Sequence, residues 1–145
     1  MLTIELVPKT SWYKNLRSEL PTEEWDRIRK DSYKNAGYRC EVCNGKGDKW
    51  PVEAHEIWDY DDKKHVQKLM GIISLCPMCH KVKHIGLAQI NGEYDMALKH
   101  LAKVNKWNIE KAKRYINKQF DKWLERNKYE WEIDITFLKQ IKKET

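Results

Sequence analysis

Four cysteines in two close pairs are the residues of this sequence best suited to bind a metal ion. They are Cys40 and Cys43, then Cys76 and Cys79, in the arrangement C-x2-C-x32-C-x2-C. A two-residue gap lets both thiolates of a tight turn bind one tetrahedral ion at about 2.3 Å. We therefore predict a structural Zn²⁺ site. In a reducing compartment, disulfides are the weaker interpretation.

Three histidines lie close to these cysteines in the sequence. His80 and His84 are four residues apart in "LCPMCHKVKH", and His55 lies in "VEAHEIW", between the two cysteine pairs. A spacing of i and i+4 places two imidazoles on one helical face, where they can hold one ion. A zinc ion bound by four thiolates has no need of imidazole ligands. The histidines are therefore predicted to form a second, separate site.

Other interpretations of single histidines stay open. His80 could replace one cysteine as a zinc ligand, and His84 could lie in solvent or donate to a backbone carbonyl. His55, on an apolar strand, could be a hydrogen-bonded core residue. His65 and His100 have no such context and are expected at the surface.

Each cysteine pair with its tight turn is called a knuckle here. Along the chain the first knuckle is followed by a strand histidine, the second knuckle and two helix histidines, and this order resembles that of the HNH nucleases. The resemblance rests on "CEVC", "VEAHEIW" and "LCPMCHKVKH" and covers about 45 of the 145 residues. It implies a ββα-metal fold with a four-cysteine zinc, in which His55 is the general base. His80, helped by His84, would bind Mg²⁺, Mn²⁺ or a similar ion. The flanking stretch "SWYKNLRSELPTEEWDRIRK" is also similar to phage and bacterial proteins that carry this module.

Two positions depart from the pattern of that family. Ala54 stands before the base, where Asp or His is usual, and Gly71 stands near the position of the family's Asn. Neither side chain can bind a metal, so a carboxylate would have to replace the missing ligand. We favour Glu56 because it adjoins the base, although strand alternation points it to the opposite face. The other acidic candidates are Glu53, Asp59 and Asp61.

The elements that must position these residues follow from hydrophobic periodicity and breakers. Alternation predicts strands at 2–8, 51–58, 69–75 and 131–138, with a charged loop at 59–68. The glycines of "CNGKGDKW" are expected to supply the positive φ of the first knuckle. Helices are predicted at 22–36, with Thr22 as N-cap, from Pro77 to Gly86 or Asn91, at 93–105, and at 108–128, capped by Asn108.

These elements predict an α+β fold in a single domain spanning 1–145. It would consist of a zinc-stapled HNH-like core at about 37–90, a basic helical layer at about 93–128 and a terminal strand at about 130–138. We expect that strand to pair with residues 2–8, so that the two chain ends form a small antiparallel sheet. Trp12, Trp50, Trp58, Trp107 and Trp131 are expected in the core rather than as base-stacking platforms.

The last predicted helix carries a stripe of basic residues beside an apolar face. The basic residues are Lys111, Arg114, Lys118 and Lys122, and the apolar ones are Ile109, Ala112, Ile116, Phe120 and Trp123. Such a stripe could follow a phosphate backbone, or it could be an ordinary solvated face.

The composition agrees with DNA as a partner without requiring it. There are 28 Lys and Arg against 22 Asp and Glu, and the isoelectric point is about 9.0. No apolar run approaches the roughly 18–20 residues of a membrane span, and the first ten residues do not resemble a secretory leader. We therefore expect a cytoplasmic protein without a membrane partner.

The sequence favours a metal-dependent HNH endonuclease that hydrolyses DNA. Its rival is a catalytically degenerate HNH-fold zinc protein that acts as an adaptor for DNA or for a protein partner. A third possibility is that the protein acts only through its basic helix, with the histidines packing around the zinc.

Overall fold

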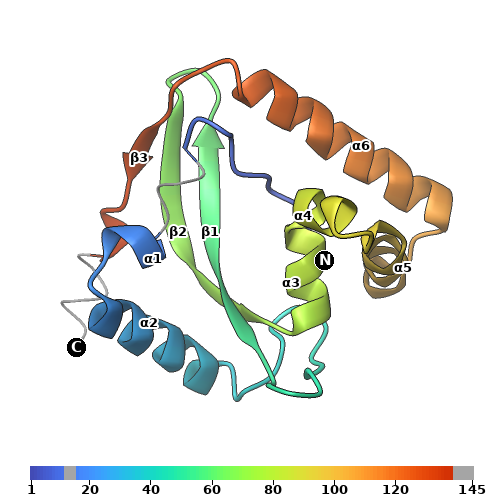
Figure 1. Ribbon diagram of the computed structural model, residues 1–145, viewed down its shortest axis with the longest axis horizontal. Helices are drawn as coiled ribbons and strands as arrows, with labels where there is room; N and C mark the ends of the chain where they lie inside the picture. Colours follow the sequence, from blue (N-terminus) through green and yellow to red (C-terminus); the bar gives the residue numbers. More distant parts are fainter. Residues whose placement is uncertain (12–15, 139–145) are drawn as a thin grey trace.

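A long β-hairpin forms the centre of the computed structural model, which describes residues 1–11 and 16–138 (Figure 1). Strand β1 (Glu53–Asp61) pairs antiparallel with β2 (Val66–Leu75). The two strands were predicted, but the predicted loop at 59–68 is mostly strand. Pairing continues to Asp61 opposite Val66, and Asp61 accepts hydrogen bonds from the backbone N–H of Lys63 (3.0 Å) and Lys64 (2.9 Å), which closes the turn. The charged residues therefore lie on the exposed tip of a hairpin.

Six helices among the described residues flank this hairpin (Figure 1). They are α1 (Leu16–Glu19), α2 (Thr22–Asn35), α3 (Pro77–Lys83), α4 (Ile85–Ile90), α5 (Tyr94–Asn105) and α6 (Ile109–Arg126). The long predicted helices are confirmed, and Asn108 caps α6 by accepting from the N–H of Lys111 at 2.8 Å. Thr22, however, is the first residue of α2, and Pro21 occupies the N-cap position without a side-chain bond.

Two hydrophobic clusters lie among the described residues and divide the helices between them. Trp25 and Ile28 of α2 pack with Leu16, Trp58, Leu69 and Leu138. Helices α3 to α6 contribute to the other cluster, together with Leu2, Ile4, Leu75 and three of the cysteines. The hairpin contributes side chains to both clusters. It therefore joins the two halves of the core.

The N-terminal segment is not a strand, and this corrects the sequence prediction. Leu2 and Ile4 are buried in the larger cluster as alternation suggests, but side chains of two helices satisfy their backbone. The Leu2 N–H donates to Asn105 Oδ1 (2.7 Å), and its carbonyl accepts from Asn105 Nδ2 (2.8 Å). The Ile4 N–H donates to the Tyr115 hydroxyl (2.9 Å), and the Trp123 indole donates to the Val7 carbonyl (3.0 Å).

The two chain ends do not form the predicted antiparallel sheet, because the N-terminal segment is not a strand. Of residues 131–138, only β3 (Glu132–Asp134) is a strand, and it pairs parallel with β2 at Val66–Lys68. The result is a three-stranded mixed sheet in the order β1-β2-β3. The α+β class is thus confirmed, whereas the joining of the two ends is not.

The tryptophans follow the core prediction with one exception. Trp58 and Trp131 are buried, and Trp107 packs at the edge of the larger cluster. Trp50 is 51% exposed, so its placement in the core was wrong. Trp12 lies outside the described residues.

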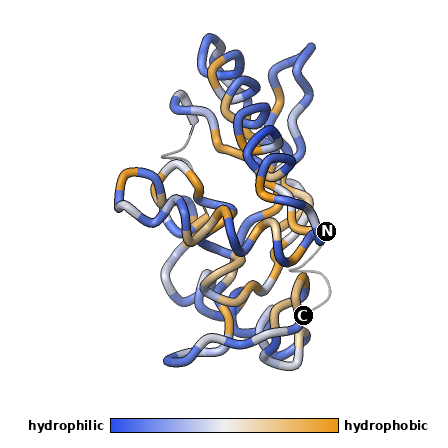
Figure 2. Tube along the Cα trace, turned by 90° about the vertical axis from the view of Figure 1, so that its right-hand side faces the viewer, coloured by the Kyte–Doolittle hydropathy of each residue, from blue (hydrophilic) through white to orange (hydrophobic). Residues whose placement is uncertain are grey.

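No helix in the described part of the chain is long and apolar enough to cross a membrane. Figure 2 shows hydrophilic residues mixed with hydrophobic ones along the helical segments in view.

Candidate metal centres

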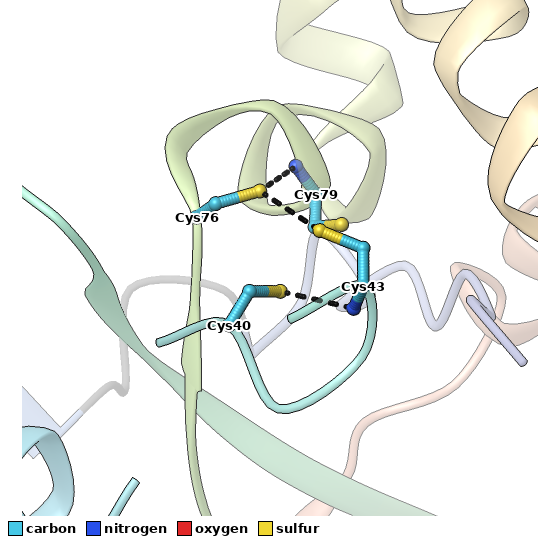
Figure 3. Close-up of side chains that lie close together, drawn as sticks. All are labelled: Cys40, Cys43, Cys76 and Cys79. Carbon is cyan, nitrogen blue, oxygen red and sulfur yellow. Dashed lines mark hydrogen bonds between the residues drawn. The ribbon is translucent and has the colours of Figure 1, made fainter. Parts of the chain in front are cut away.

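The four cysteines converge at the base of the hairpin, as Figure 3 shows. Cys40 and Cys43 lie in the turn after α2, Cys76 follows β2, and Cys79 is in the first turn of α3. Their four sulfur atoms all lie within 4.8 Å of one another, and the Cys43 and Cys76 sulfurs are 3.6 Å apart. A tetrahedral ion with bonds of about 2.3 Å keeps its sulfurs about 3.8 Å apart, so these four side chains fit Zn²⁺.

Backbone N–H groups support both knuckles. The Cys43 N–H points to the Cys40 sulfur (3.5 Å), and the Cys79 N–H points to the Cys76 sulfur (3.4 Å). Asn44, rather than a glycine, has the positive φ (63°) of the first knuckle, because Asn also tolerates the left-handed region. Gly47 is needed for space, since a Cβ there would lie 2.3 Å from the Trp50 carbonyl oxygen.

One thiol of the cysteine cluster, that of Cys40, is suited to negative charge, whereas two others hold their protons. A hydrogen bond with the Cys79 side chain, opposed by burial and assisted by backbone N–H groups, lowers the pKa of Cys40 to about 4. The same bond, together with burial and the Cys40 charge, raises the pKa of Cys79. Burial raises the pKa of Cys76 to about 11. A cation bound by all four sulfurs would displace the remaining thiol protons, which ties zinc affinity to pH.

His100 adjoins this cluster, which corrects its expected place at the surface. It is half-buried on α5, and its Nε2 lies 3.2 Å from the Cys79 sulfur. An imidazole N–H at this distance can donate to a zinc-bound thiolate, as outer partners of metal ligands commonly do. Only the packing of α5 on α3 reveals the contact, since Cys79 and His100 are 21 residues apart.

The three candidate histidines form a separate cluster between β1 and α3. One nitrogen from each of His55, His80 and His84 lies within 4.8 Å of the other two. The Nε2 atoms of His80 and His84 are 3.0 Å apart, near the roughly 3.3 Å expected of two imidazoles on one ion with bonds of 2.0–2.1 Å. Helix α3 ends at Lys83, but the His84 N–H still donates to the His80 carbonyl (3.1 Å), which keeps both rings on one face.

The surroundings of His55 and His84 favour their neutral imidazoles, each of which has one nitrogen with a free lone pair. Burial, followed by the nearby charges of His84 and His80, lowers the pKa of His55 to about 2. Although the His84 side chain is exposed, desolvation beside the rings of His55 and His80, followed by the charge of His80, lowers its pKa to about 4. Neutral imidazoles with available lone pairs are what a divalent transition metal requires. The donor set therefore fits an ion.

Glu53, and not Glu56, is the carboxylate at this cluster. Glu53 Oε1 lies 3.2 Å from His80 Nδ1, a contact that holds a proton on Nδ1 and leaves Nε2 free for a ligand. Glu56 points to the other face of β1, where it accepts from the Leu16 N–H (2.8 Å) and the Trp58 indole (3.1 Å). Burial raises the pKa of Glu56. The favoured choice of Glu56 beside the base is therefore corrected by the alternation of the strand.

The other positions named from the sequence supply no ligand to the histidine cluster. Ala54 lines a groove of about 270 Å³ beside His80, and Gly71 pairs with Ile57 in the middle of the hairpin. His65, on the hairpin turn, stacks on Tyr129 at 4.0 Å between ring centroids. The basic residues of α6 are exposed: Lys111, Arg114, Lys118 and Lys122. Helix α6, which carries them, lies along the outer edge of the molecule (Figure 1).

The chain was compared with protein-family models, with curated proteins and with solved structures, and none of them matches it. The two residue clusters and their geometry therefore carry the functional argument.

Proposed function

We propose that the protein is a metal-dependent endonuclease of HNH type that hydrolyses phosphodiester bonds of DNA. The observation that carries this proposal is the convergence of His55, His80 and His84 at ligand distance, apart from four cysteines that suffice for a structural zinc. The hairpin and the helix that supply the histidines are the parts expected of a ββα-metal unit.

His80 and His84 would hold a Mg²⁺, Mn²⁺ or similar ion, and Glu53 fixes the ring of His80. Such an ion, when bound, would acidify a water molecule and neutralise charge that gathers on the phosphate. His55 is a neutral base on the facing strand and accepts the proton of the attacking water. Because its pKa is about 2, His55 alone is a weak base. Most of the acidification must therefore come from the cation site.

The exposed basic face of α6 would give non-specific affinity for the DNA backbone. Its exposed residues Arg114, Lys118 and Lys122 neutralise phosphates and release counterions, so that affinity falls as salt is raised. Lys111 lies 5.0 Å above the ring of Trp107 and is partly engaged there. Only the exposure of these basic residues and their spacing along α6 support this role.

A supercoiled-plasmid assay tests the proposal. Purified protein is incubated with Mg²⁺, Mn²⁺, Ni²⁺ or EDTA beside His55→Ala, with zinc content measured for each sample. We expect metal-dependent nicking that falls by a factor of at least about 100 in His55→Ala. His65→Asn is the matched control, because His65 lies outside the cluster and Asn tolerates its φ of 56°. Equal nicking by wild type and His55→Ala would show that His55 is not the base.

The adaptor remains a second candidate, and Ala54 and Gly71 favour it. Neither supplies the ligand that the HNH pattern expects at its position. Calorimetry with Mn²⁺ or Ni²⁺ separates the two proposals. A second site that is weaker than the zinc site and lost in His80→Ala supports the enzyme, whereas one tightly held zinc and no further binding supports the adaptor.

A further inference from the structure

A groove that opens beside His80 combines aromatic rings with arginine side chains. It has a volume of about 270 Å³ and lies between α2, α1 and the start of β1. Trp25, Tyr33 and Trp50 line it together with Arg17 and Arg29. His80 and Glu53 also line it, so the groove runs directly into the histidine cluster. Whatever occupies it lies next to the proposed site of cleavage.

Trp50 is the least expected side chain in this groove. It is 51% exposed, although Trp is on average a highly buried residue. Its position is fixed by the loop before β1, where the Trp50 carbonyl oxygen closely approaches Gly47. Tyr33, which is half-buried, lies across the groove on α2. Aromatic faces of this kind stack on nucleobases with little dependence on sequence.

The charges of the groove favour an anion at the arginines. Arg17 is exposed at the end of α1. Arg29 is held by Asp26 through a single bond from Nε to Oδ1 (2.9 Å), and a guanidinium has further N–H donors to offer. Glu53, the carboxylate that lines the groove, contacts Nδ1 of His80. Asp26 offsets the charge of Arg29, and the charge of Arg17 interacts with Glu56 without an ion-pair contact between them, so Arg17 keeps its guanidinium donors for a ligand in the groove.

The size of the groove limits the ligand. At about 270 Å³ it is slightly smaller than most ligand pockets, which span roughly 300–1,000 Å³. It can take one base with its phosphate, but a base pair within an intact duplex cannot place its flat face against Trp50. The groove thus selects an unpaired nucleotide.

We propose that this groove binds one unpaired nucleotide of a DNA strand, with its base against Trp50 and its phosphate at Arg17 and Arg29. This inference rests on the proposed nuclease function, because it makes the neighbouring phosphodiester the one that reaches His55, His80 and His84. The protein then prefers single-stranded or frayed DNA over intact duplex.

Fluorescence anisotropy of the zinc-loaded full chain tests the proposal without cleavage. The probes are a labelled single strand of about 12 nucleotides, a hairpin duplex of the same sequence and an RNA strand of the same sequence, with no second metal added. The variants are Trp50→Ala, Trp50→Phe and Arg17→Ala. Lys30→Ala is the matched control, because it removes an exposed cation of α2 that does not line the groove.

We expect tighter binding of the DNA strand than of the hairpin or the RNA. Trp50→Ala and Arg17→Ala should each weaken strand binding about tenfold, whereas Trp50→Phe should keep most of it. Lys30→Ala should change it by less than about twofold. No binding of the strand, equal binding of the hairpin, tighter binding of the RNA, or equal losses in Lys30→Ala and Arg17→Ala would each overturn the proposal.

The result is separable from that of the nuclease assay. If Trp50→Ala loses strand binding while wild type never nicks plasmid, the groove stands and the nuclease function falls. If wild type nicks plasmid in a metal-dependent way while Trp50→Ala binds the strand normally, the groove falls alone. Zinc content and thermal melting confirm that each variant is folded.

Discussion

At the scale of single residues, Glu53 is the side chain with the most specific role. It contacts Nδ1 of His80 at 3.2 Å and so directs the opposite nitrogen of that ring toward His84. A carboxylate in this position raises the basicity of the histidine and fixes its tautomer. Glu53 is thus expected to act on a metal ion through His80 rather than by direct contact.

Glu53→Ala should therefore weaken binding of Ni²⁺ or Mn²⁺ at the histidine cluster by about 10- to 100-fold. Glu53→Gln should recover part of this loss, because an amide oxygen still accepts from the His80 ring. Isothermal titration calorimetry measures both affinities. Asp59→Ala is the control, since Asp59 is exposed on the same strand. Unchanged affinity in Glu53→Ala would remove the carboxylate from the metal site.

The sequence predicted the ligand residues better than the residues that support them. Each cysteine pair and the His80–His84 pair could be predicted because spacing within one turn is a local property, whereas the place of His55 beside them was implied by the resemblance to the HNH nucleases. Glu53 and His100 depend on contacts across elements, and such contacts leave no local signal. The alternation of a strand did exclude Glu56 from the face of His55, and preferring adjacency over alternation led to the wrong choice.

At the scale of elements, the N-terminal segment shows why alternation alone does not define a strand. Leu2 and Ile4 alternate with polar residues and are buried, as in a strand at the edge of a sheet. Their partners, however, are Asn105 and Tyr115, more than 100 positions away. The α2, α5 and α6 helices were predictable because the period of 3.6 and the caps are local. Which element covers an extended segment is decided by tertiary packing.

Asn105→Ala should therefore destabilise the protein by about 1–3 kcal/mol, because it leaves both the N–H and the carbonyl of Leu2 without partners in a buried place. Urea unfolding followed by circular dichroism measures the free energy of unfolding. The control is Asn117→Ala on the exposed side of α6, which should change it by less than about 0.5 kcal/mol. Equal effects of the two substitutions would show that the segment is not held by Asn105.

An ion pair between the buried Lys83 and the partly exposed Glu5 holds the same segment to α3. Lys83 is only 9% exposed and donates to Glu5 Oε2 (2.9 Å) and to Thr3 Oγ1 (3.0 Å). Glu5→Ala should cost about 1–2 kcal/mol, because it leaves the Lys83 ammonium with one neutral partner while the partial exposure of Glu5 screens the pair. The double variant with Lys83→Met should recover much of that loss, since no unpaired charge then remains. A double variant that is less stable than Glu5→Ala in urea unfolding would contradict this account.

At the scale of the whole molecule, the cysteine cluster joins parts that otherwise pack in different clusters. Cys40 and Cys43 follow α2, which packs with Trp58 and Leu69, whereas Cys76 and Cys79 lead into α3 and the larger cluster. The bound ion would close a loop of 33 positions between Cys43 and Cys76. Closing such a loop removes entropy from the unfolded chain in addition to the energy of the metal–thiolate bonds.

Loss of zinc should therefore loosen the relation of the two halves before it affects the long helices. Cys43→Ser is the variant of choice, because Cys43 is the least buried of the four and its replacement creates little cavity. We expect Cys43→Ser to lose the ion and several kcal/mol of stability. Zinc-stripped wild type should melt at the same lowered temperature as Cys43→Ser. Native mass spectrometry should show that His80→Ala keeps one zinc per chain, because the four cysteines are separate from the histidine cluster. If stripped wild type melts as the zinc-loaded protein does, the packing of the two clusters alone holds the molecule together, and the ion is not structural.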